Sequence, residues 1–63
     1  MQPHQAELSS IASAVGELTE RITVLADGFA QDKVDDLAYD LYEVERALRN
    51  ANRRLAKVVH RGQ

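Results

Sequence analysis

Apolar residues recur along this chain at alternating intervals of three and four, in two separate runs. This is the heptad pattern of a helix that buries one stripe of its surface against another helix. The step between the runs, from Phe29 to Val34, fits neither interval, so the pattern predicts two amphipathic helices and a break. We call the residues of both runs the heptad seam: Leu8, Ile11, Val15, Leu18, Ile22, Leu25, Phe29, Val34, Leu37, Leu41, Val44, Leu48, Ala51, Leu55 and Val58.

Local signals for helix ends predict where the break lies. Pro3 suits the first turn of a helix, and Gly28 suits the left-handed C′ position just past a helix end. Asp32 suits an N-cap, and Asp35 and Asp36 would place negative charge at the positive end of a second helix. We therefore expect a single hairpin over residues 1–63, with one helix over about 3–27, a turn over about 28–31 and a second helix over about 32–60. So short a connection favours antiparallel neighbours.

One alternative topology is a single long bent helix. Ile22, Ala26, Ala30 and Val34 are spaced by four, which could carry the apolar stripe through the break with a local change of phase. The Gly28 and Asp32 signals favour the hairpin over this alternative.

A chain of 63 residues folded as two helices is too small to enclose a core. It contains no cysteine, which excludes disulfides and thiolate metal sites, so association is the remaining route to stability. We expect an all-α, coiled-coil-like antiparallel hairpin that forms a homodimeric four-helix bundle. Small residues beside the seam would let a second pair of helices approach: Ala12, Ala14, Ala26, Ala38 and Ala47.

Charge is unevenly distributed, although the net charge is only -2. Residues 46–63 carry six basic residues and no acidic one, whereas the acids lie in the preceding part of the chain. Such asymmetry is typical of a surface for nucleic acid or an acidic partner.

A second stripe on the second helix is expected to face away from the seam. It consists of Tyr39, Tyr42, Arg46, Arg49 and Arg53, which we call the Tyr/Arg stripe. Tyrosine and arginine are enriched in binding hot spots, and they can also stack on bases and contact phosphates. A plain solvated face is the simpler interpretation, since Glu45 with Arg49 and Glu43 with Arg46 have favourable helical spacings. The candidate partner-binding residues are the stripe together with Arg54, Lys57 and Arg61.

No pattern in the chain indicates catalysis. Ser9, Ser10 and Ser13 have no histidine at helical spacing to activate them. His4 and His60 lack the spacing and the carboxylates of a metal site, and there is no glycine-rich phosphate loop. We therefore expect no catalytic, cofactor-binding or metal-binding residues, no cofactor, and no enzyme activity.

Other sequence features bear on the cellular location of the protein and on the kind of genome that encodes it. No stretch is apolar and long enough to span a membrane, and residues 1–5 lack the features of a signal peptide, which predicts a cytoplasmic protein without membrane binding. Arginine outnumbers lysine six to two, a bias typical of GC-rich bacterial genomes.

Three functions remain open at this point. The first is a homo-oligomeric interaction module that presents the Tyr/Arg stripe to an acidic protein partner. The second is a nucleic-acid-binding regulator that uses the basic C-terminal half of the second helix. The third is a purely structural coiled coil whose function is self-assembly.

Overall fold

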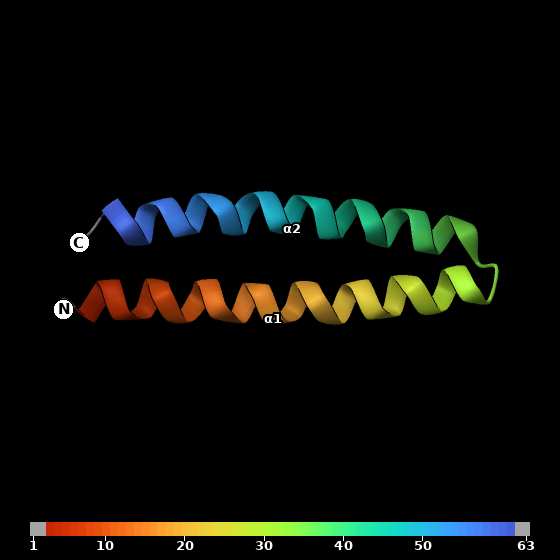
Figure 1. Cartoon of the computed structure of the whole chain (residues 1–63), viewed down its shortest axis with the longest axis horizontal. Helices are drawn as coiled ribbons and strands as arrows, with labels where there is room; N and C mark the ends of the chain where they lie inside the picture. The colour runs from red at the N-terminus through yellow and green to blue at the C-terminus, as the bar shows by residue number, and fades with distance from the viewer. Residues whose placement is uncertain (1–2, 62–63) are drawn as a thin grey trace.

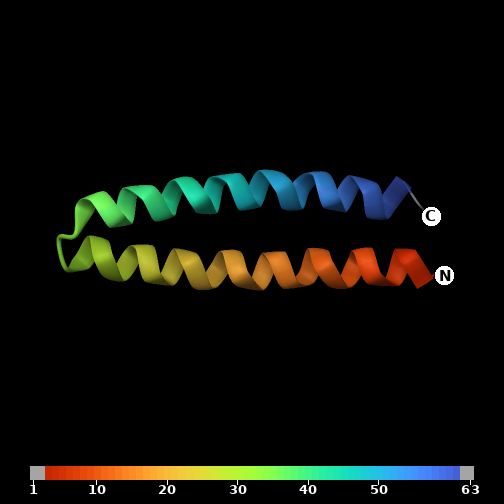
Figure 2. The same cartoon turned by 180° about the vertical axis from the view of Figure 1, so that it is seen from behind.

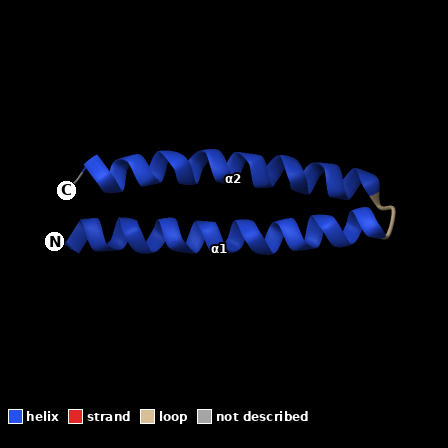
Figure 3. Ribbon diagram, in the orientation of Figure 1, coloured by secondary structure: helices blue, strands red, loops and turns tan. Residues whose placement is uncertain are grey.

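The computed structural model describes residues 3–61, which form two antiparallel helices. Helix α1 spans Pro3–Gln31 and helix α2 spans Asp35–Arg61. They lie side by side along their whole length, with their free ends together at the end opposite the turn (Figures 1 and 2). Among the described residues there is only helix and one short connection (Figure 3). The predicted all-α hairpin is confirmed, and the alternative of one continuous bent helix does not form.

The turn lies later in the chain than the sequence signals predict. Gly28 is helical and not the C′ residue, because α1 continues to Gln31. Lys33 instead takes the left-handed conformation, with φ 63°. The amide of Lys33 donates to the Ala30 carbonyl at 3.1 Å and that of Val34 to the Phe29 carbonyl at 2.8 Å. These two bonds make a Schellman motif with Lys33 at C′ and Val34 at C″.

The extension of α1 has a packing reason. A helix that ended near Asp27 would leave Phe29 off the apolar stripe, whereas the observed continuation to Gln31 keeps Phe29 in phase with Ala26. In a Schellman motif the C3 and C″ residues commonly touch, and here these are Phe29 and Val34, the last and first seam residues of the two runs.

The start of α2 also differs from the expectation. Asp32 is not its N-cap; the helix begins at Asp35, and the Val34 carbonyl accepts the first bond, from the amide of Ala38 at 3.1 Å. Asp35 and Asp36 do occupy the first turn of α2, and His60 and Arg61 the last. Both placements complement the helix dipole.

The line of contact between the helices has a heptad spacing of its own. The residues that lie along it are buried or half-buried. We call them the contact line: Gln5, Leu8, Ala12, Val15, Thr19, Ile22, Ala26 and Phe29 of α1, Val34 of the connection, and Ala38, Leu41, Glu45, Leu48, Asn52, Leu55 and Val59 of α2. Every second member is a large apolar seam residue, and the residues between are small or polar except for Val59.

Small and polar side chains occupy the tightest part of this contact. Ala26 is 0% exposed and Ala38 is 3% exposed, and no large side chain among the described residues is fully buried. The Thr19 hydroxyl is satisfied by donating to the Val15 carbonyl at 2.6 Å within α1. The Gln5 amide nitrogen donates to the Val59 carbonyl and so joins the free ends of the two helices. The hairpin is thus closely packed but has a thin apolar core.

Candidate interaction surfaces

Two broad faces flank the contact line, and they differ in chemistry. In an antiparallel pair, the residues that come just before a contact-line residue in sequence lie on one side of the pair for both helices. The residues that come just after a contact-line residue lie on the other side. The seam residues that immediately precede a member of the contact line form what we call the apolar face: Ile11, Leu18, Leu25, Leu37, Val44, Ala51 and Val58. The residues immediately after its large members form the polar face: Ser9, Gly16, Thr23, Tyr42, Arg49 and Ala56.

The structure therefore divides the predicted heptad seam into two halves. The first half lies between the helices: Leu8, Val15, Ile22 and Phe29 of α1, Val34 just before α2, and Leu41, Leu48 and Leu55 of α2. The other half makes up the apolar face and is exposed. Of the small residues beside the seam, Ala12, Ala26 and Ala38 lie on the contact line, and Ala14 and Ala47 are exposed.

The Tyr/Arg stripe runs along the outer margin of the polar face. Tyr39 is 65% exposed and Tyr42 is 37% exposed. The Tyr42 hydroxyl donates a hydrogen bond to the Asp27 carboxylate of α1, which sequence reasoning did not identify. This bond favours the protonated phenol and is the main reason that the pKa of Tyr42 is raised above its ordinary value of 10.0.

The two ion pairs that the helical spacing favours are both present. The Nε of Arg49 lies 2.8 Å from Oε2 of Glu45, and Nη1 of Arg46 lies 3.9 Å from Oε2 of Glu43. Glu45 lies on the contact line. The hydrogen bond from Arg49 first, and then the nearby Thr23 hydroxyl of α1, lower the pKa of Glu45 below its ordinary value of 4.5. The Thr23 hydroxyl itself donates to the Thr19 carbonyl at 3.1 Å.

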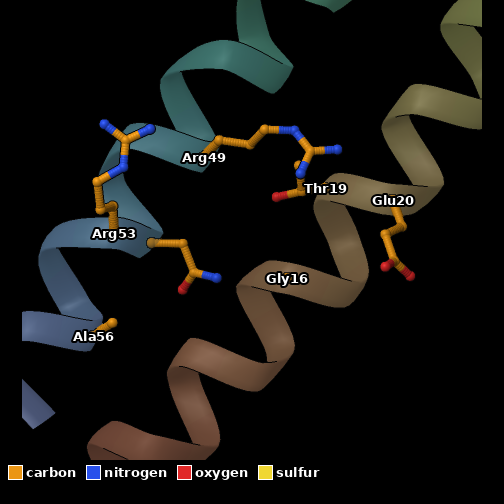
Figure 4. Close-up of a pocket in the computed structure, with 7 residues that line it drawn as sticks. Gly16, Thr19, Glu20, Arg49, Arg53 and Ala56 are labelled. Carbon is orange, nitrogen blue, oxygen red and sulfur yellow. The ribbon is translucent and has the colours of Figure 1, made fainter.

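A hollow of about 420 Å³ lies between the helices on the polar face (Figure 4). Its walls come from both helices: Gly16, Thr19 and Glu20 from α1, and Arg49, Asn52, Arg53 and Ala56 from α2. Figure 4 shows the Arg49 side chain extending across toward Thr19, whereas that of Arg53 projects away from α1. Gly16 leaves this side of α1 open, since a Cβ there would lie 3.5 Å from Nδ2 of Asn52.

Asn52 carries the one orphaned polar atom in this part of the molecule. Its Oδ1 is buried without a hydrogen-bond partner within the described chain. Arg53 is engaged elsewhere, since its Nη1 lies 3.4 Å from Oδ1 of Asn50. The hollow can therefore accept a polar group, but it brings together no nucleophile with a base that could activate it.

The remaining candidate partner-binding residues do not share the stripe's face. Arg54 and Arg61 lie at the outer edge of the apolar face, and Lys57 lies on the side of α2 turned away from α1. All three are exposed. The predicted set thus separates into the stripe on one side of the hairpin, Arg54 and Arg61 on the other side, and Lys57 on the outer surface of α2.

No group of three or more His, Asp or Glu residues within residues 3–61 is arranged to hold a metal ion, and neither α1 nor α2 has the length and apolarity needed to cross a membrane. Comparison with known proteins found no matching family model, no similar curated protein and no similar solved structure.

Proposed function

We propose that this chain is a small, non-enzymatic, homo-oligomeric helical interaction module that presents its Tyr/Arg stripe to an acidic protein partner. The observation that carries the proposal is the separation of two opposite faces, one apolar and one bearing exposed Tyr and Arg side chains. If both faces were plain solvated surfaces, an exposed apolar face of this extent would not be expected.

The stripe has the chemistry of a binding surface. Arg46 has a side chain that is 78% exposed and holds Glu43 only at 3.9 Å, so most of its donors are available. Tyr39 offers a large exposed ring on the same margin. Arginine and tyrosine are the residue types that most often anchor protein interfaces. The excess of basic residues after position 45 favours an acidic partner.

Self-association into a homodimeric four-helix bundle is part of the same proposal. The support is the thin core: Ala26 and Ala38 are the buried apolar residues of the described chain. Two alanines contribute little apolar burial, and the larger contact-line side chains are only partly buried. A scaffold of this size gains its missing stability by association.

Partner binding is tested by comparing two charge-matched variants. R46A/R53A removes two positive charges from the stripe, and S10E/Q31E makes the same change in net charge on the outer surface of α1. Each is immobilised beside the wild type and exposed to a lysate of the source organism, with and without nuclease. We expect an acidic protein to be retained by the wild type and by S10E/Q31E but lost with R46A/R53A.

The other outcomes decide between the alternatives. Retention that disappears after nuclease treatment, and that weakens steeply as salt rises, would establish nucleic-acid binding instead. Retention by all three proteins alike, or by none, would contradict the stripe and leave self-assembly as the function. Light scattering and circular dichroism over a dilution series test the oligomer separately, and a stable helical monomer would refute it.

A further inference from the structure

The apolar face is an unpaired surface of the hairpin. Its leucine, isoleucine and valine side chains are between 43% and 58% exposed. They are not scattered, because Ile11, Leu18 and Leu25 follow one another at intervals of seven on α1. On α2 the residues at intervals of seven are Leu37, Val44, Ala51 and Val58. Contiguous apolar patches of this kind mark interaction sites in proteins of ordinary size.

The accessible area indicates how much surface remains to be covered. The chain exposes 4986 Å². A folded monomer of 7.0 kDa is expected to expose about 4,000 Å². The excess of roughly 1,000 Å² is close to the ~800 Å² that each partner buries in a standard stable interface. One partner on one face would therefore bring the chain into the normal range.

The charges along the edges of this face are self-complementary. The register is set by the turn at one end and by the bond from Gln5 to Val59 at the other. In this register the two edges run side by side, with Glu7 and Arg54 toward the free ends of the helices and Arg21 and Asp40 nearer the turn. The α1 edge thus carries one acid and one base, and the α2 edge carries Asp40 with the bases Arg54 and Arg61. From the turn outward, the base comes first on α1 and the acid comes first on α2.

A second copy can satisfy this pattern in either two-fold orientation. With the axis along the hairpin, Glu7 of one copy faces Arg54 of the other, and Arg21 faces Asp40. With the axis across the hairpin, Glu7 faces Arg21 and Asp40 faces Arg54. An isologous interface must be complementary to itself, and these edges are so in both cases.

We propose that a second copy of this chain docks on the apolar face, face to face about a two-fold axis. The inference rests on the homo-oligomer of the proposed function and assigns its interface. Small residues, Ala14 and Ala47, lie between the acidic and basic positions of the two edges and permit close approach of the helices. The two Tyr/Arg stripes then lie on opposite outer sides of a four-helix bundle, so that one dimer can bind two partner molecules.

Two matched alanines of α2 allow a direct test, because the chain has no cysteine. Ala51 lies on the apolar face and Ala56 on the polar face, and both are exposed in the hairpin. The measurement is the rate at which a maleimide reacts with the thiol of the A51C and A56C variants, over a range of protein concentrations. We expect the A51C rate to fall at least about 10-fold as the dimer forms, since only the dissociated fraction reacts, and the A56C rate to stay constant.

Protection of A56C in place of A51C would overturn the assignment, and so would a dimer by light scattering in which neither thiol is protected. A helical monomer at every concentration would refute the homo-oligomer itself, which is a different failure.

A second experiment compares the dimer Kd of the variants L18E/V44E and R46E/R53E. We expect L18E/V44E to raise the dimer Kd at least about 100-fold, because it buries unpaired carboxylates. R46E/R53E should leave the Kd within a few-fold, and an equal loss in both variants would contradict the proposal.

Discussion

The phenolic hydroxyl of Tyr42 on α2 donates a hydrogen bond to the carboxylate of Asp27 on α1, and the bond joins the two helices near the turn. The same tyrosine belongs to the surface that we propose for partner binding. One edge of its ring is therefore held by the hairpin, while Tyr39 is held by no hydrogen bond from its side chain within residues 3–61. The stripe thus combines Tyr42, whose ring is positioned by its bond to Asp27, with Tyr39, whose ring is not positioned in this way.

Because of the bond between Tyr42 and Asp27, we expect the hairpin to lose stability at alkaline pH. The pKa of Tyr42 is raised above 10.0 in the folded chain, so the protonated phenol stabilises the fold below that pH, and this contribution is lost as pH rises through the folded value. In a Y39F background, the ultraviolet absorbance of tyrosinate reports Tyr42 alone. We expect D27A to move the midpoint back toward 10.0; an unchanged midpoint would show that Asp27 is not the cause.

Glu45 should produce the opposite dependence at acidic pH. Its pKa is lowered below 4.5 by Arg49 and Thr23, so its carboxylate stabilises the fold above that pH and the contribution is lost as pH falls through the folded value. We expect the free energy of unfolding of the wild type to fall more steeply below pH 4.5 than that of E45Q. Denaturant titrations at matched protein concentration would measure the difference, and parallel curves for the two proteins would exclude this role for Glu45.

The variant G28A separates the observed helix end from the one that the sequence signals suggest. Gly28 is helical, and a Cβ there would meet no atom within 4 Å. Alanine is favoured over glycine in a helix by about 1 kcal/mol, so we expect G28A to raise the free energy of unfolding by about that amount. If Gly28 were a left-handed C′ residue, the same change would destabilise the chain. Chemical denaturation at fixed protein concentration distinguishes the two results.

Lys33 is the residue that the turn places in a costly conformation. A left-handed backbone costs a non-glycine residue about 1–2 kcal/mol, and glycine avoids this cost. Part of that gain is cancelled because glycine loses more conformational entropy on folding. Because φ at Lys33 is 63°, we expect K33G to stabilise the hairpin by about 0.5–1 kcal/mol. The β-branched variant K33V should destabilise it, and thermal unfolding of the two at one protein concentration would show opposite shifts.

The buried Oδ1 of Asn52, which has no hydrogen-bond partner within the described chain, weakens the contact between the two helices. Replacing it with leucine removes a buried acceptor without a partner and adds apolar surface between the helices. We expect N52L to raise the free energy of unfolding by about 1–2 kcal/mol. The matched control is N50L, at an exposed position of the same helix, which should change stability little. Equal effects in the two variants would mean that Asn52 is not part of a dry contact.

Much of the local structure could be predicted from the sequence. The spacing of Glu45 and Arg49 predicted an ion pair that forms at 2.8 Å, and Asp35 and Asp36 do lie in the first turn of α2. The contact between Tyr42 and Asp27 could not be predicted in this way, because it depends on the relative rotation of two helices. The only hint of that rotation was the row of small residues beside the seam, among them Ala12, Ala26 and Ala38.

The sequence by itself determined that two amphipathic helices form and fold back on each other, because heptad spacing and helix propensity act within each segment. Only the tertiary structure decided which half of the wide apolar stripe lies between α1 and α2. A stripe that covers both Ile22 and Leu25 can be buried at more than one rotation of the helix. The small side chains of Ala26 and Ala38 let the backbones approach closely at one of these rotations. That choice turns Leu25, Leu18 and Ile11 outward and creates the apolar face.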